Sequence, residues 1–246
     1  AGGSASFAIG HPEKVVDFAY RAMHEMAVHA KALVQTYYGS AARLSYYEGC
    51  STGGRQGMIS AQRYPADFDA IIAGAPVYNQ LALNGAQLND MQIVLLDQTR
   101  YLPPEKIELL HSAVLAACEA HYGVDDGFLN NPLACDFDPA SLACGSSDSA
   151  ACLTPQQLQS VRNVYAGVTD SSGSLLYPGH APGFEMGWRM LTTGSTPPAL
   201  QSDAFAFVAH EDPEWQWQDF VLEADLALAR DKAGYIEALD PDLSEF

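Results

Sequence analysis

Apolar residues in the first part of the chain recur at the spacing of an amphipathic helix. They repeat every three to four positions from Val16 to Val34, between Pro12 and Gly39. Proline in a first turn and glycine after a last turn are typical of helix boundaries. This pattern predicts a helix that begins near His11 and ends at Gly39.

The pattern then changes to two short strand-like runs on either side of a second helix. A strand is expected over residues 42–47, and a helix then runs to about Tyr64, where Pro65 stops it. The apolar run 70–76 is typical of a buried parallel strand. Residues 11–76 therefore predict a βαβ unit with a preceding helix.

From Tyr78 onward helical patches alternate with long polar loops, with no second βαβ pattern and no internal repeat. The patches cover residues 88–101, 104–121 and 155–166. We therefore expect an α-rich insertion and three parts: core 1–77, lid 78–235, and a return toward the core over 236–246. Two strands alone cannot bury both faces of a sheet, so the sequence is expected to be cut at both ends.

Composition and charge exclude several classes of protein. The 246 residues are 48% hydrophobic, which suffices for a sizeable core. No apolar run reaches the roughly 18 residues of a membrane helix. Thirty acidic against 12 basic residues give a net charge of −18, and such a surface repels nucleic acid and anionic lipid. The start carries neither an initiator Met nor a signal peptide, so a removed leader or a fragment is expected.

Four of the five cysteines fall in one loop-rich segment, residues 118–152. They lack the C-x-x-C pairs of a zinc site. Two disulfides are the better interpretation, and they indicate an oxidising, secreted or periplasmic location. The residues alone leave three pairings open, and Cys50 is left over.

The segment Gly49-Cys50-Ser51-Thr52-Gly53 matches the G-x-S-x-G pattern of a serine-hydrolase nucleophile elbow. Its position between a predicted strand and a predicted helix is the context that this motif requires. The turn exposes the Ser51 hydroxyl, and the N–H group of Thr52, at the positive end of the helix, is one oxyanion donor.

A longer stretch around this motif resembles the tannase/feruloyl esterase family. The resemblance covers essentially the whole chain, and its most specific feature is a Cys directly before the nucleophile. The resembling segments are residues 45–56, 61–69, 74–76, 17–22 and 240–243. It implies a partial α/β-hydrolase core with a large lid, and hydrolysis of a small aromatic ester, such as a galloyl or feruloyl ester, through a serine acyl-enzyme.

The resemblance assigns Ser51 as the nucleophile and Thr52 as an oxyanion donor. The family's base is a His followed by a Cys, and that Cys pairs with the one before the serine. None of the seven histidines here is followed by Cys. The acid, the base, the second oxyanion donor and the partner of Cys50 are therefore expected outside this chain, which by itself should be inactive.

The resemblance also implies the disulfides Cys118–Cys135 and Cys144–Cys152, and a calcium ion in the lid. The family's ligands fall at the positions of Glu119, Tyr122, Val124, Asp126 and Phe128. A tyrosine at an expected acidic position is a poor ligand for a hard cation. We therefore expect weak calcium binding by Glu119, Val124, Asp126 and Phe128, unless Asp125 or water fills the gap.

Other interpretations stay open at this point. A non-catalytic lid or scaffold fragment that keeps the elbow is one alternative, and acyl transfer by the same residues is another. His24 and His29 are five residues apart, whereas a helical zinc-protease motif needs four. Lid aromatics are expected to form core in preference to stacking a phenolic ring: Tyr177, Trp188, Trp215 and Trp217.

Overall fold

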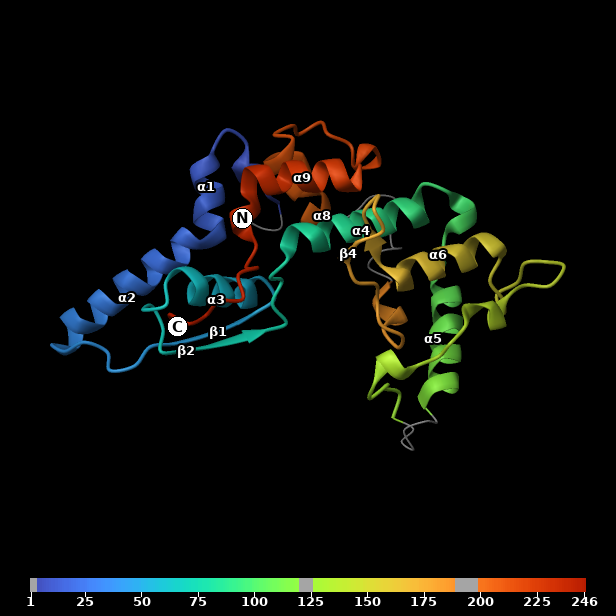
Figure 1. Cartoon of the computed structure of the whole chain (residues 1–246), viewed down its shortest axis with the longest axis horizontal. Helices are drawn as coiled ribbons and strands as arrows, with labels where there is room; N and C mark the ends of the chain where they lie inside the picture. The colour runs from blue at the N-terminus through green and yellow to red at the C-terminus, as the bar shows by residue number, and fades with distance from the viewer. Residues whose placement is uncertain (1–3, 120–125, 189–198) are drawn as a thin grey trace. The chain divides into compact units, whose positions relative to one another are not determined.

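The computed structural model describes residues 4–119, 126–188 and 199–246. The chain forms two compact units. Unit 1 contains residues up to Asn84 together with Ser202–Gln216 and Glu223–Phe246. Unit 2 contains Gly85–Gln201 and Trp217–Leu222. Figure 1 shows the elements of both units along the chain.

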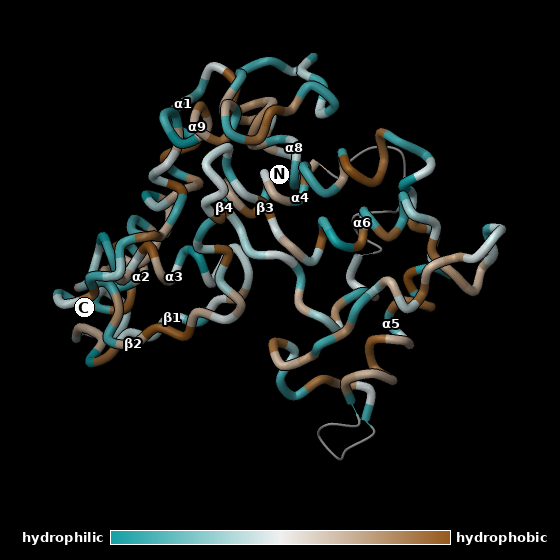
Figure 2. The backbone as a smooth tube through the Cα atoms, turned by 45° about the vertical axis from the view of Figure 1, so that its right-hand side comes forward, coloured by the Kyte–Doolittle hydropathy of each residue, from teal (hydrophilic) through white to brown (hydrophobic). Residues whose placement is uncertain are grey.

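A βαβ unit forms one part of unit 1, as the sequence predicts (Figure 1). Strand β1 (Tyr46–Cys50) pairs in parallel with β2 (Ala70–Gly74), and α3 (Thr52–Arg63) connects them. β1 begins four residues later than predicted and runs up to the serine. The pairing with β2 sets these bounds, because only the residues from Tyr46, opposite Ala70, to Cys50, opposite Gly74, have a partner in the other strand. The hydrophobic stretch of β2 is brown in Figure 2.

The long N-terminal helix is confirmed, with one local irregularity. It consists of α1 (Pro12–Val16), a π-helical turn (Asp17–Arg21) and α2 (Ala22–Tyr38). Gly39 ends it at φ 73°, and its N–H group donates to the carbonyl of Gln35. This left-handed conformation favours glycine, which explains the predicted boundary.

The C-terminal part of the chain packs against these helices within unit 1. The elements are a π-helical turn (Ala204–Ala209), α9 (Leu222–Ala233), whose first residue belongs to unit 2, and a 3-10 turn (Gly234–Ile236). The short helix α8 (Ala199–Asp203) comes just before them and spans the division between the units. Ala233 and Ile236 share a core with Ala8, Val15 and Ala19. Residues 202–216 and 223–235 therefore belong to the compact unit that holds the βαβ segment. A functional division into core and lid stays a prediction.

Unit 2 is mainly helical. α4 (Gln80–Leu95) leads into it from unit 1, eight residues before the predicted start. α5 is Pro104–Cys118 and α6 is Pro155–Ala166, the second as predicted because Thr154 and Gln157 form a capping box. The smaller elements are 3-10 turns at Gln98–Arg100, Pro132–Ala134, Pro139–Leu142, Glu185–Trp188 and Trp217–Asp219, and an antiparallel pair of β3 (Val168–Thr169) with β4 (Leu175–Tyr177).

The core of unit 2 lies between α5 and α6. Its buried members include Ile107, Leu110, Leu158, Val161 and Trp188. Trp217 is also buried, so Trp188 and Trp217 are core side chains, as expected, whereas Trp215 and Tyr177 are half-buried. Among the described residues no helix combines the length and apolar character needed to cross a membrane.

Both disulfides implied by the resemblance are present, and both lie in unit 2. One joins Cys118 to Cys135 and the other joins Cys144 to Cys152. Local crosslinks of this kind stabilise a loop-rich region by restricting the unfolded chain. Cys50 is a free, exposed thiol.

Candidate active site

Ser51 occupies a strained turn between β1 and α3. Its backbone has φ 59° and ψ −118°, although it is not a glycine. Such conformations cost about 1–3 kcal/mol and cluster at functional sites. The serine is exposed, and its N–H group donates to the carbonyl of Gly74 at 3.0 Å. The carbonyl of Ser51 accepts from the N–H groups of Arg55 at 3.0 Å and Val77 at 3.3 Å. This strand–turn–helix backbone is the structural context that the G-x-S-x-G pattern requires.

Glycines around the serine allow backbone segments to approach one another closely. A Cβ atom on Gly49 would lie 2.7 Å from the carbonyl carbon of Gly53. A Cβ atom on Gly54 would lie 2.5 Å from the carbonyl oxygen of Gly74 and 2.9 Å from the Cα atom of Pro76. The spacing Gly-x-Ser-x-Gly-Gly therefore fits a helix pressed against two strands. The sequence motif explains Gly49, whereas the role of Gly54 emerges only from packing.

Arg55 is a site residue that the sequence reasoning missed. Its side chain is fully buried, and its guanidinium donates to the carbonyls of Phe18, Ala19 and Ile236 at 3.3, 3.1 and 3.0 Å. Burial lowers its pKa to about 10, so it stays protonated at neutral pH. The guanidinium also lies 4.9 Å from the centre of the Phe18 ring. Arg55 thus ties the helix behind Ser51 to the rest of unit 1.

Cys50 lies on the uncovered face of the two-stranded sheet. Every second residue of β1 is exposed on that face, namely Tyr46, Glu48 and Cys50. Ile72 of β2 is exposed there too. Residues including Glu48, Cys50 and Ile72 line a shallow depression of about 340 Å³. The thiol is therefore accessible, and its pairing with a cysteine outside the chain stays a prediction.

Within the described ranges no histidine is hydrogen-bonded to Ser51. His24 Nδ1 lies 2.8 Å from Asp67 Oδ2, and its ring stacks on Tyr64 with the centroids 3.9 Å apart. His210 Nε2 lies 2.8 Å from Asp225 Oδ1. These pairs connect helices to loops elsewhere in unit 1, so neither of them contacts Ser51.

The comparison with known sequences decides the family. The family model described as "Tannase and feruloyl esterase" matches residues 1–228. The chain belongs to the tannase and feruloyl esterase family. A probable feruloyl esterase B-2 of Aspergillus fumigatus is 35% identical over 240 residues, which is 96% of this chain and 45% of that protein. The chain thus spans about half the length of the curated relatives it matches.

Solved structures agree with this family. An esterase from Aspergillus oryzae matches with a TM-score of 0.92 at 32% identity, over 100% of this chain and 49% of that one. Feruloyl esterase B from Aspergillus oryzae matches with a TM-score of 0.91 at 30% identity, over 99% of this chain and 50% of that one. The predicted fold, a partial α/β-hydrolase core with an α-rich, disulfide-bonded region, is confirmed.

The loop for which the sequence resemblance implies calcium is only partly described. Glu119 Oε1 accepts from the N–H group of Gly127 at 2.6 Å, and Asp126 Oδ1 accepts from the N–H group of Phe128 at 3.2 Å. Tyr122, Val124 and Asp125 lie outside the described residues. The two carboxylates belong to one loop anchored by the Cys118–Cys135 disulfide. Carboxylate oxygens are ligands that calcium prefers, so Glu119 and Asp126 suit the ion chemically, and calcium binding stays a prediction.

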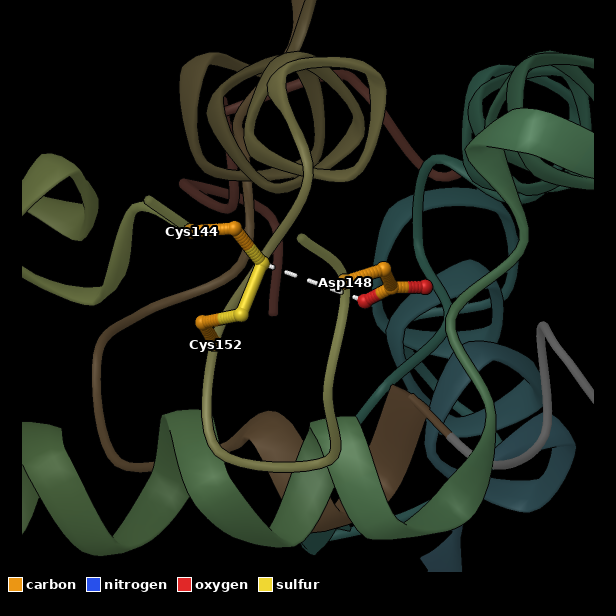
Figure 3. A group of neighbouring side chains, drawn as sticks. All are labelled: Cys144, Asp148 and Cys152. Atoms are coloured by element: carbon orange, nitrogen blue, oxygen red, sulfur yellow. Dashed lines mark hydrogen bonds between the residues drawn. A yellow bond between two sulfur atoms is a disulfide. The ribbon is translucent and has the colours of Figure 1, made fainter. Parts of the chain in front are cut away.

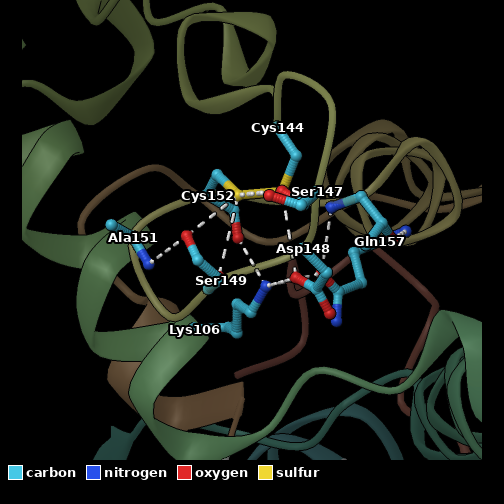
Figure 4. Close-up of a disulfide and its surroundings, with 9 residues drawn as sticks. Lys106, Cys144, Ser147, Asp148, Ser149, Ala151, Cys152 and Gln157 are labelled. Carbon is cyan, nitrogen blue, oxygen red and sulfur yellow. Dashed lines mark hydrogen bonds and ion pairs between the residues drawn. A yellow bond between two sulfur atoms is a disulfide. The ribbon is translucent and has the colours of Figure 1, made fainter.

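A second cluster of residues of the kinds that bind metals contains a disulfide. Cys144, Asp148 and Cys152 lie together in unit 2 (Figure 3). The two sulfur atoms are bonded to each other, so they are not thiolate ligands. The buried Lys106 ammonium donates to Asp148 Oδ1 at 2.6 Å and Gln157 Oε1 at 3.2 Å, which anchors the disulfide loop to α5 and α6 (Figure 4).

Proposed function

We propose that this chain carries the nucleophile of an aromatic carboxylic ester hydrolase, with Ser51 as the attacking residue. The observation that carries the proposal is the strained, exposed Ser51 at the end of β1, with α3 beginning at the next residue. Relatives named as feruloyl esterases at 33–35% identity support an aromatic ester as the substrate.

The reaction proceeds in two steps through an acyl-enzyme. Ser51 Oγ bonds to the ester carbonyl carbon as its proton passes to a base, and the oxyanion accepts a hydrogen bond from the Thr52 N–H group. The C–O bond to the alcohol then breaks, and the alcohol leaves with a proton. In the second step water gives a proton to the base and bonds to the acyl carbon. The bond from that carbon to Ser51 Oγ then breaks, Ser51 regains its proton, and the acid leaves. The base and the acid are expected outside this chain, and this expectation is supported by the absence, among the described residues, of a histidine hydrogen-bonded to Ser51.

Three further assignments accompany this function. The disulfides favour an oxidising, secreted or periplasmic location. The charge of −18 favours a small-molecule partner over nucleic acid or a membrane surface. A calcium ion bound by Glu119, Val124, Asp126 and Phe128 would tie the loop after α5, and its role is structural.

A non-catalytic scaffold is the second candidate, and it is favoured by the absence of a histidine hydrogen-bonded to Ser51 in the described part of the chain. Acyl transfer would use the same serine. A scaffold would have no reason to keep an exposed serine at a positive φ, because strain without function only lowers stability.

The test uses the complete protein, meaning this chain together with the segments that supply the acid and the base. Ser51→Ala should lower aryl-ester turnover by several orders of magnitude and abolish labelling by a fluorophosphonate. Ser45→Ala, just before β1, is the matched control and should leave both unchanged. Labelling at another serine, with Ser51 spared, would show that the nucleophile is wrong.

A further inference from the structure

The carbonyl oxygen of Ser51 is held by donors from two different segments. The N–H group of Arg55 comes from α3 at 3.0 Å, and that of Val77 comes from the loop after β2 at 3.3 Å. A trans peptide is planar, so its C=O and N–H bonds point in opposite directions. The two donors therefore also fix the direction of the Thr52 N–H group, which as the first residue of α3 has no acceptor within the helix.

The loop that carries Val77 is fastened in turn by a segment far along the chain. The carbonyl of Tyr78 accepts from the N–H group of Ala238 at 2.8 Å. Glu237 Oε1 accepts from the N–H groups of Leu81 at 3.2 Å and Ala82 at 3.4 Å, at the start of α4. A carboxylate at this position satisfies two unpaired donors and complements the positive end of the helix.

Glu237 is buried and its second oxygen is also engaged. Arg230 Nε donates to Glu237 Oε2 at 3.0 Å, and the same guanidinium donates to Asn79 Oδ1 at 3.2 Å. Arg230 therefore orients the carboxylate and contacts the same loop. The segment after Val77 is therefore held at four residues, Tyr78 and Asn79 in the loop and Leu81 and Ala82 in the first turn of α4.

We propose that Glu237, oriented by Arg230, is a positioning residue for the oxyanion donor. It holds the Val77 loop, the loop holds the Ser51 carbonyl, and the carbonyl sets the direction of the Thr52 N–H group. The inference rests on the proposed esterase function. A residue that only caps a helix would affect stability alone. A positioning residue also affects the rate, through weaker stabilisation of negative charge on the substrate's carbonyl oxygen.

A matched pair of substrates reads out this specific loss. An aryl ester and its thionoester differ only in whether the developing anion is on oxygen or sulfur. Sulfur is larger and accepts hydrogen bonds poorly, so a donor placed for an oxyanion favours the ester. The ratio of the two kcat/KM values measures donor placement, whereas a general loss of folded protein lowers both values equally.

The experiment compares variants of the complete protein with both substrates. Glu237→Ala should lower kcat for the ester by about 10- to 100-fold with little change in KM, and lower the ester-to-thionoester ratio about tenfold. Glu237→Gln keeps an acceptor for Leu81 and Ala82 and should retain most of the ratio. Arg230→Gln, which keeps a donor near Glu237 at a half-buried position, should give an intermediate ratio and provides a second test if Glu237→Ala does not fold.

Two controls separate the possible failures. Asp203→Ala removes another buried carboxylate, which accepts from the N–H group of Ala5, and should change stability without changing the ratio. Unchanged ratios in the Glu237 and Arg230 variants would overturn the inference while leaving the esterase proposal intact. Persistent ester hydrolysis by Ser51→Ala would instead overturn the proposed function.

Discussion

Gly54→Ala tests whether the close packing of α3 is what places the nucleophile. The new Cβ atom would lie 2.5 Å from the carbonyl oxygen of Gly74 and 2.9 Å from the Cα atom of Pro76. Both neighbours are backbone atoms, so no side chain can turn away. Ordinary contact requires a separation about 1 Å larger. Either α3 or the end of β2 must therefore move, and Gly74 is the residue whose carbonyl holds the Ser51 N–H group.

The expected magnitudes follow from this clash. Overpacking of this kind costs about 1–3 kcal/mol of folding stability. A displacement of about 1 Å at a catalytic group costs on the order of 10²-fold in rate. Gly53→Ala is the matched control, because its Cβ atom would lie 3.6 Å from the Tyr47 hydroxyl, an ordinary contact. Alanine there should be neutral or stabilise the helix by about 0.5–1 kcal/mol.

Two measurements on the complete protein check this prediction. Urea unfolding gives the stability, and the rate of fluorophosphonate labelling gives the reactivity of Ser51 without involving the ester substrate. Gly54→Ala should be impaired in both and Gly53→Ala in neither. Equal behaviour of the two variants would refute the argument that the Gly54 contact positions the elbow.

Three other predictions concern titration, metal binding and the chain by itself. Burial raises the pKa of Asp90 to about 7 from 3.8, so its folded state holds the proton more tightly and stability should fall as pH rises from about 4 to 7. Asp90→Asn, beside His180, should remove up to about 3 kcal/mol of the loss between pH 5 and 8. Urea unfolding at these two pH values measures it, and an unchanged pH dependence would contradict it. Asp126→Ala should weaken calcium binding in a calorimetric titration, and unaltered affinity would show that the ligands are wrong. The 246-residue chain alone should not turn over an aryl ester, because no described histidine is hydrogen-bonded to Ser51 to act as base; robust turnover by the purified chain would disprove this.

Local sequence patterns were enough to predict an element wherever neighbouring residues decide its backbone conformation. Gly39 ends a helix because a left-handed residue is needed there, and Thr154 with Gln157 begins one by capping its donors. Gly49-x-Ser51-x-Gly53 likewise specifies a sharp turn within a few residues. Such elements depend on backbone sterics and on hydrogen bonds between near neighbours, which a sequence displays directly.

The tertiary structure decided the features that depend on distant partners. The start of β1 follows from pairing with β2 rather than from its own residues. Arg55 reads as a surface arginine on a helix, yet it is buried against a carbonyl 181 residues away. Glu237 sits in an acidic C-terminal segment and caps a helix 156 residues earlier. The sequence by itself determined the local turn at Ser51, the proposed nucleophile. Only the fold determined what holds that turn in place, because burial and long-range hydrogen bonds arise when distant segments meet.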